Sequence, residues 1–78
     1  MKIVYSQKAT ECLPASVCEQ IANILINEEN PQDGDEIGID LQGRRPSDDI
    51  DQHYKVVIKF DSEGGERVVS FMLQEEIR

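Results

Sequence analysis

The chain has 78 residues, of which 38% are hydrophobic and 31% are charged, with a formal net charge of −8 and a pI near 4.4. This length predicts one domain, residues 1–78, with a small core. The negative charge argues against bare nucleic acid and anionic membrane as partners, because both are polyanions, and it favours a basic protein surface.

The N-terminal sequence MKIVYSQKAT has too short an apolar run for a secretory signal peptide. The longest apolar-rich stretch, Val17–Ile26, is interrupted by polar residues and is too short to span a membrane. The two cysteines, Cys12 and Cys18, are too few for a disulfide framework. We therefore expect a cytoplasmic protein.

Residues 2–6 (KIVYS) are mostly β-branched and aromatic, which predicts a short strand. Over Pro14–Glu28 the hydrophobic period becomes that of a helix, although Thr10 could cap an earlier turn. The Asn30–Pro31 step ends this helix, because a residue before proline avoids helical backbone angles. The expected buried stripe consists of Val17, Ile21, Ile24 and Leu25, with Cys18 at its edge.

Residues 36–42 (EIGIDLQ) alternate apolar and polar side chains, as a strand with one buried face does. Residues 53–61 and 67–74 alternate in the same way around the turn sequence SEGGE and predict a β-hairpin. We centre its turn on Glu63–Gly64. Three cross-strand pairs then share the buried face: Ile58 with Val69, Val56 with Phe71, and Tyr54 with Leu73.

The order of these elements predicts an α+β fold. We expect a two-layer sandwich in which one helix packs on a mainly antiparallel four-stranded sheet, in the order β-α-β-β-β. No internal repeat, low-complexity run or linker divides the chain.

No group of residues indicates catalysis. His53 is the one histidine and stands at the start of an expected strand, two residues from Asp51 and without an assigned nucleophile. Cys12 or Cys18 could pair with this imidazole, but Cys18 belongs to the apolar stripe, where free cysteine usually fills the core. We therefore predict that the chain is not an enzyme and has no catalytic residue.

Metal and cofactor motifs fail at the positions that matter. If Asp33 is the first residue of a calcium loop, Gly38 falls at the required sixth position, but Arg44 stands at the twelfth, where a glutamate belongs. Two cysteines and one histidine are too few for zinc, and SEGGE lacks the lysine of a phosphate loop. We predict no metal and no cofactor. An adventitious cation stays open among Asp48, Asp49 and Asp51.

Residues 27–51 hold nine of the sixteen acidic residues and only two arginines. One interpretation is solubility. The other is an acidic face that docks onto a Lys/Arg groove built for nucleic acid and competes with phosphates there. The sequence RRPS offers Ser47 to a basic-directed kinase, or its arginines only neutralise nearby carboxylates. The predicted partner-binding residues are Glu28, Glu29, Asp33, Asp35, Glu36, Asp40, Asp48, Asp49 and Asp51.

The second face of the hairpin is left open, because one helix can cover only one side of the sheet. It combines aliphatic residues with lysines, a composition typical of a protein contact or a dimer interface, although scattered exposed aliphatic residues are also common. The residues of this alternative interface are Lys55, Val57, Lys59, Val68 and Met72.

The leading prediction is a non-enzymatic acidic module that blocks a basic surface of a nucleic-acid-binding protein, with no direct contact to nucleic acid or membrane. In size, charge and lack of catalytic residues the chain is similar to small phage-encoded inhibitors of bacterial defence, such as anti-CRISPR proteins and DNA mimics. That likeness lies in size and composition. The alternative is a small structural or regulatory protein that homodimerises through the open sheet face.

Overall fold

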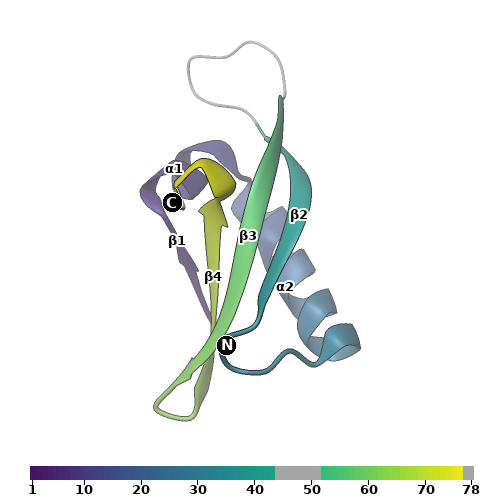
Figure 1. Ribbon diagram of the computed structural model, residues 1–78, viewed down its shortest axis with the longest axis vertical. Coiled ribbons are helices and arrows are strands. Elements are labelled where there is room, and N and C mark those ends of the chain that lie inside the picture. Colours follow the sequence, from purple (N-terminus) through teal and green to yellow (C-terminus); the bar gives the residue numbers. More distant parts are fainter. Residues whose placement is uncertain (44–51, 77–78) are drawn as a thin grey trace.

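The chain folds into a sheet with helices on one side. In the computed structural model, residues 1–43 and 52–76 are described. Figure 1 shows α1 and α2 behind the sheet, while the opposite sheet face is turned to the viewer and carries no helix in the described part of the chain. The elements are β1 (Lys2–Tyr5), α1 (Gln7–Cys12), α2 (Ala15–Glu29), β2 (Glu36–Gly43), β3 (Gln52–Glu63), β4 (Glu66–Leu73) and the 3₁₀ turn η1 (Gln74–Glu76).

The sheet is mixed, with the strand order β1-β4-β3-β2. Strand β4 pairs antiparallel with β3 and parallel with β1, and β2 pairs antiparallel with β3. The α+β class is confirmed, but the prediction of a mainly antiparallel sheet with one helix was wrong. Strands β1 and β2 are joined through helices, and such a connection brings the chain back in the same direction. Strand β1 therefore runs parallel to β2 and to its own neighbour β4.

The region before the predicted helix forms a separate short helix, α1. Its N-cap is Ser6, whose Oγ accepts a hydrogen bond from the Ala9 N–H at 3.1 Å. Thr10, which the sequence suggested as a cap, lies inside α1 instead. The helix ends at Leu13, which takes an extended conformation because Pro14 follows. The element order is therefore β-α-α-β-β-β in the described residues.

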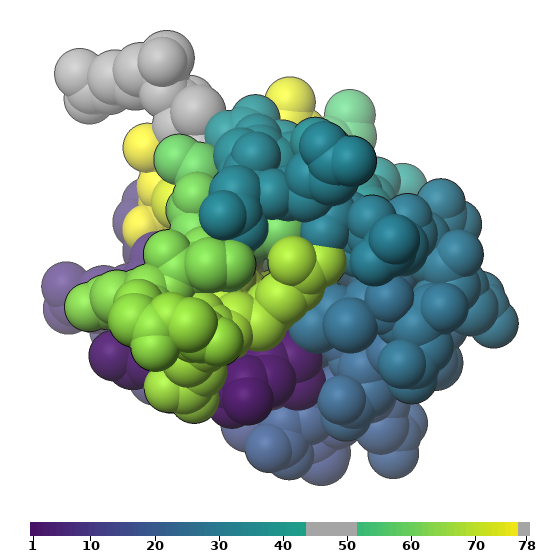
Figure 2. Space-filling view, turned by 90° about the horizontal axis from the view of Figure 1, so that it is seen from below, coloured from purple at the N-terminus to yellow at the C-terminus, as the bar shows by residue number. Residues whose placement is uncertain are grey.

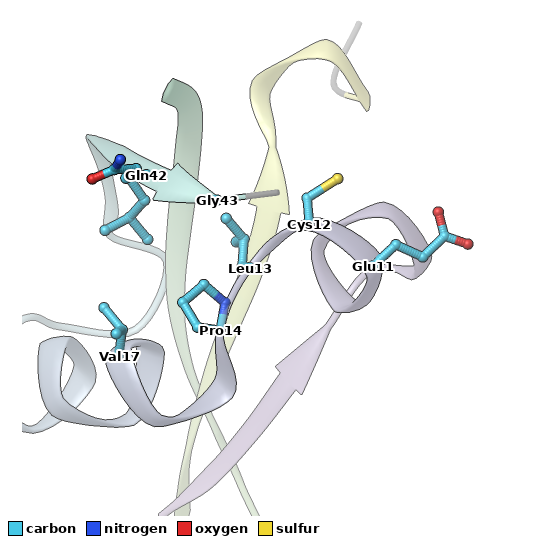
Figure 3. Close-up of a pocket in the computed structure, with 8 residues that line it drawn as sticks. Glu11, Cys12, Leu13, Pro14, Val17, Gln42 and Gly43 are labelled. Atoms are coloured by element: carbon cyan, nitrogen blue, oxygen red, sulfur yellow. The ribbon is translucent and has the colours of Figure 1, made fainter. Parts of the chain in front are cut away.

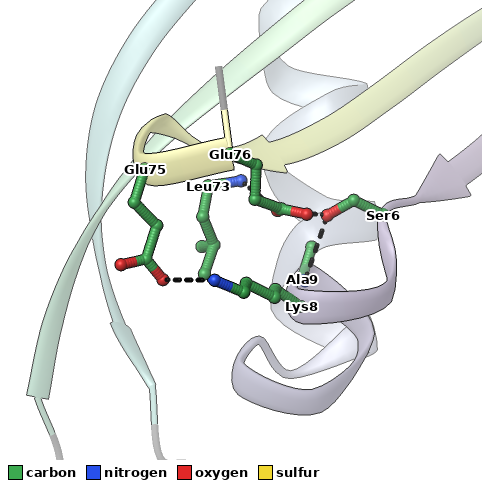
Figure 4. A network of polar contacts seen from close by, with 6 residues as sticks. All are labelled: Ser6, Lys8, Ala9, Leu73, Glu75 and Glu76. Carbon is green, nitrogen blue, oxygen red and sulfur yellow. Dashed lines mark hydrogen bonds and ion pairs between the residues drawn. The ribbon is translucent and has the colours of Figure 1, made fainter. Parts of the chain in front are cut away.

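A carboxylate from the end of the described chain fixes the start of α1. The Ser6 hydroxyl donates to Glu76 Oε1 at 2.5 Å, and the same oxygen accepts the Leu73 N–H at 3.0 Å (Figure 4). Beside it, Lys8 Nζ lies 3.8 Å from Glu75 Oε1. These contacts join α1 to η1, which are far apart in the sequence. The ion pair is exposed on both sides, so we assign it little weight in stability.

Helix α2 matches the predicted bounds but buries a different stripe. Cys18 and Ala22 are fully buried, whereas Val17 is 39% exposed and Ile24 is 53% exposed. Helix α2 therefore turns its small residues, and not its largest aliphatic ones, toward the strands. The prediction that Val17 and Ile24 belong to the core was wrong, and Leu25 is only partly buried.

The hairpin has the predicted buried face and a different register. Ile58 lies opposite Phe71, Val56 opposite Leu73, and the turn falls on Gly64–Gly65 rather than on Glu63–Gly64. Both glycines have positive φ, 58° and 81°, as a two-residue hairpin turn requires. The shift is two residues, so every side chain keeps its face.

The core lies between the inner sheet face and the two helices. Its largest fully buried side chains are Phe60, Phe71, Ile58, Leu73, Val56, Val69 and Cys18. Of the helices described, none is long and apolar enough to cross a membrane.

Candidate functional site

Six acidic residues lie on α1, on α2 and in the loop that follows α2. All six are exposed: Glu11, Glu19, Glu28, Glu29, Asp33 and Asp35. We call them the acidic helix layer. Residues 7–35 contain these six acids and one basic residue, Lys8, so this layer has a formal charge of −5 (one minus six). None of the four glutamates makes an ion pair within the described residues.

Two of these acids have a structural role as well. Asp35 Oδ2 accepts the Gln32 N–H at 2.8 Å, which closes the turn after α2. Asp33 Oδ1 accepts the Ser62 hydroxyl at 2.8 Å and so ties that turn to β3. Both aspartates therefore stabilise the entry into β2 whatever else they bind. Asparagine at either position keeps a side-chain acceptor and removes the charge.

The remaining predicted partner-binding residues that the structure describes lie on the opposite face. Glu36 is opposite Lys59 and Asp40 is opposite Lys55 in the β2–β3 pairing. Each of these carboxylates therefore has a lysine directly across the strand pair. The predicted acidic face is divided between two sides of the molecule, and only the helix side has a large uncompensated charge. Asp48, Asp49, Asp51 and Ser47 lie outside the described residues.

The open sheet face brings together the predicted hairpin residues. Val57 is directly opposite Met72, and Val68 is opposite Asp61. The parallel strand β1 adds Lys2 and Val4, which sequence reasoning missed because it did not place β1 beside β4. Three lysines and five acids share this surface, so its formal charge is −2 (three minus five). Its residues are Lys2, Val4, Glu36, Gly38, Asp40, Gln42, His53, Lys55, Val57, Lys59, Asp61, Glu63, Glu66, Val68, Ser70 and Met72.

A further surface lies along the edge of the sheet that β2 forms, between β2 and α2. Val17 of α2 and Leu41 of β2 line one hollow of about 650 Å³, together with the α1–α2 junction and the end of β2 (Figure 3). Val17, Ile21 and Ile24 are spaced i, i+4 and i+7 and so share one flank of α2. The inward side chains of β2 next to it are only partly buried. We call this surface the β2 flank: Val17, Ile21, Ile24, Ile37, Ile39 and Leu41. Its signal in the sequence was the helical stripe, which was assigned to the core.

The residues weighed for catalysis are not brought together as a reactive pair. His53 is exposed on the outer face of β3, while Cys12 and Cys18 are buried, free thiols. Burial raises the pKa of the Cys18 thiol, and a buried protonated thiol is a poor nucleophile. Among residues 1–43 and 52–76, no three His, Cys, Asp or Glu side chains are placed to hold a metal ion.

The buried thiol predicts loss of stability at alkaline pH. Burial raises the pKa of Cys18 above its ordinary value of 9.0, and burial with the nearby Cys18 and Glu19 raises that of Tyr5 above 10.0. The folded state thus holds these protons more tightly than the unfolded chain. Their contribution is fully present below pH 9.0 and is lost as the pH rises through the raised values.

We expect the urea concentration at the midpoint of unfolding to stay constant near neutral pH and to decrease above pH 9.0. A Cys18→Ala variant should show a smaller alkaline decrease, although the vacated volume lowers its stability at neutral pH by roughly 1 kcal/mol. Identical slopes for both proteins above that pH would contradict the assignment to Cys18.

Comparison of the chain with protein-family models, with curated proteins and with solved structures finds no match. The arrangement of its own residues is therefore the basis for any function assigned to it.

Proposed function

We propose that this chain is a non-enzymatic binding module whose acidic helix layer blocks a basic surface of a nucleic-acid-binding protein. The partner supplies lysines and arginines that otherwise contact phosphates, and the module occupies them with carboxylates. The module itself contacts neither nucleic acid nor membrane. An inhibitor of this kind works by competition, so it needs charge and shape rather than a reactive group.

The observation that carries this proposal is the position of Glu28 and Glu29. Both stand in the last turn of α2, which has no basic residue there and no acidic residue in its first turn. Carboxylates at a helix C-terminus are unfavourable because they meet the negative end of the helix dipole, at a cost of roughly 0.3–1 kcal/mol each. Acids that lower the stability of their own helix are expected where binding requires them.

The division of charge between the two sides supports the same proposal. On the open sheet face each carboxylate of β2 has a lysine opposite it. Among the described glutamates of the helix layer, only Glu11 has a lysine near it on its own helix, Lys8, and that lysine pairs with Glu75. A basic partner is therefore attracted to the helix side. Long-range attraction of this kind accelerates association and weakens with salt.

The test neutralises one side at a time. The first variant carries Glu11→Gln, Glu19→Gln, Glu28→Gln and Glu29→Gln, changes that keep helix-forming side chains. The control removes three acids from the other face through Glu36→Gln, Asp40→Asn and Asp61→Asn. Both are compared with the unmodified chain as affinity baits in a lysate at low and high salt, and captured proteins are assayed for nucleic-acid binding with and without the module.

We expect the unmodified chain and the control to capture a nucleic-acid-binding protein and displace its nucleic acid. The helix-layer variant should bind that protein about a hundredfold more weakly, since four exposed charge pairs at roughly 0.7 kcal/mol each are lost. The same variant should be slightly more stable to urea, because Glu28 and Glu29 no longer oppose the helix dipole. Equal binding by both variants, or capture without displacement of nucleic acid, would contradict the proposal.

A further inference from the structure

Strand β2 forms one edge of the sheet. It extends over eight residues and pairs with β3 alone in the described part of the chain. Proteins usually protect such an edge with charged side chains, above all lysine, with proline or with a bulge, and of these β2 has only the carboxylates of Glu36 and Asp40. Glu36–Gly43 contains neither lysine nor proline, and its pairing with β3 is continuous from end to end. The outward N–H and C=O groups of residues 36–40 are thus in a position to pair with another strand.

The surface beside this edge is mainly apolar, with Glu28 at its far end, four residues after Ile24 on the same flank of α2. Ile24 is 53% exposed and Val17 is 39% exposed, two of the four large hydrophobic side chains with high exposure in the described residues. Val17 lines the same hollow as Leu41, so this flank of α2 faces the β2 side. Figure 2 shows α2 and the segment leading into β2, in blue and teal, together on one side of the molecule, away from the green hairpin tip.

We propose that two copies of this chain pair antiparallel through β2 about a two-fold axis, forming one eight-stranded sheet with the two β2 flanks in contact beneath it. A two-fold axis perpendicular to the sheet keeps both helix layers on the same side. It also places each inward side chain opposite an inward one. Every pair of opposed residues must then have numbers of the same parity.

The charges select one register. Two registers overlap by seven residues, 36–42 or 37–43, and place either Ile39 opposite Ile39 or Asp40 opposite Asp40 of the second copy. The second register sets like charges directly against each other, which is unfavourable. The first sets Asp40 opposite Gly38 and Ile37 opposite Leu41. The space beside Gly38 is open, since an added Cβ there would meet nothing within 4 Å. Aliphatic residues then face aliphatic residues along the inner side.

The strand that pairs with β2 belongs to a second copy of the chain, because the edge is self-complementary in this register. Each protomer supplies the same aliphatic residues and the same hydrogen-bonding strand, as an isologous interface requires. Both copies carry a net charge of −8, so their mutual repulsion is screened by salt. This dimer should therefore tighten as ionic strength rises, whereas the acidic helix layer should bind its basic partner less tightly. The two proposals can fail separately.

The first experiment measures the dissociation constant of the whole chain by sedimentation at low and high salt. Ile24→Lys places a charge in the β2 flank and should raise the constant about a hundredfold, since the two-fold axis introduces the change twice at roughly 1.4 kcal/mol each. Val57→Lys is the matched control on the open sheet face and should leave the constant unchanged. Circular dichroism verifies that both variants fold.

A cross-linking experiment tests the register. Gly38→Cys and Asp40→Cys are prepared as separate variants; the native Cys12 and Cys18 are buried. Directly opposed strand residues lie at a separation that a disulfide can bridge. Under mild oxidation, a mixture of the two variants should form a disulfide-linked heterodimer, and neither variant alone should cross-link as efficiently.

Three outcomes would overturn the proposal: a monomer at every concentration and salt tested, a dimer that Val57→Lys but not Ile24→Lys disrupts, and self-linking of Asp40→Cys in preference to the mixed product. The second outcome would assign the dimer to the open sheet face. A monomer that still adds a foreign peptide strand at β2 would assign the edge to a different partner.

Discussion

Replacing Gly43 by alanine is expected to lower the free energy of unfolding by about 3 kcal/mol, the upper part of the range for overpacked sites. Gly43 is the last residue of β2 and lies against the α1–α2 junction. A Cβ at this position would overlap the carbonyl oxygen of Cys12 and lie 3.3 Å from the ring of Tyr54. Backbone cannot move aside as a flexible side chain can, so either β2 or α1 must shift.

The matched control is Gly38→Ala in the same strand. Its Cβ would meet nothing within 4 Å, and its backbone does not have positive φ. This variant should be as stable as the unmodified chain or slightly more stable, because alanine restricts the unfolded chain. Urea denaturation of both variants measures the difference. Equal stability of the two would show that β2 and α1 do not approach each other as closely as described.

The second large effect is expected from Phe71→Ala, which should cost about 4 kcal/mol. Phe71 is fully buried, lies opposite Ile58 and stacks on Tyr5 with ring centroids 5.7 Å apart. Its loss leaves a cavity where β1, β3 and β4 meet. A domain of this size has a total stability of roughly 4–12 kcal/mol, so the variant is expected to keep at most about 8 kcal/mol and to unfold at a clearly lower temperature.

Met72→Ala is the control for Phe71, because adjacent strand residues point to opposite faces. Met72 is on the open sheet face and only half-buried, and its truncation should cost about 1 kcal/mol or less. Thermal unfolding followed by circular dichroism distinguishes the two. A larger loss for Met72→Ala than for Phe71→Ala would reverse the assignment of the inner and outer faces.

The faces of the strands were predictable from the sequence, and the register of the hairpin was not. Alternation fixes which residues of β3 and β4 are buried, and the structure confirms Tyr54, Val56 and Ile58 on the inner face. A shift of two residues preserves that alternation, so the pattern cannot distinguish Val69 from Phe71 as the partner of Ile58. The turn decides it, because two consecutive positive φ angles select Gly64–Gly65.

The helical part was harder to predict because hydrophobicity scales favour large side chains. Cys18 and Ala22 contribute little to a stripe of aliphatic residues, yet they are the fully buried residues of α2. The short helix α1 escaped notice because six residues contain too little periodicity, although Ser6 is a recognisable N-cap. The parallel direction of β1 and β2 could have been inferred from the sequence, because the predicted element order already joins the two strands through a helix, and the crossover rule applies to such a connection.

The surfaces needed three-dimensional placement. The acids of residues 27–51 lie close together in the sequence. In the structure, Glu28 and Glu29 lie on the helix side, whereas Glu36 and Asp40 lie on the open sheet face. A strand places neighbouring residues on opposite faces, and a helix turns each residue by about 100° from the one before it, so closeness in the sequence does not bring acids to one side. Sequence clustering therefore overstated how many acids act together.

The pairing of β1 with β4 has a consequence for biosynthesis. Lys2 is made 66 residues before its partner Val68. The sheet cannot close until β4 has been made, and until then the apolar side chains of β1 have no strand to cover them. Folding is therefore expected to wait for the synthesis of β4, at the slower rate typical of chains whose contacts are distant in sequence. A ribosome-stalled chain lacking β4 should stay sensitive to protease over its whole length.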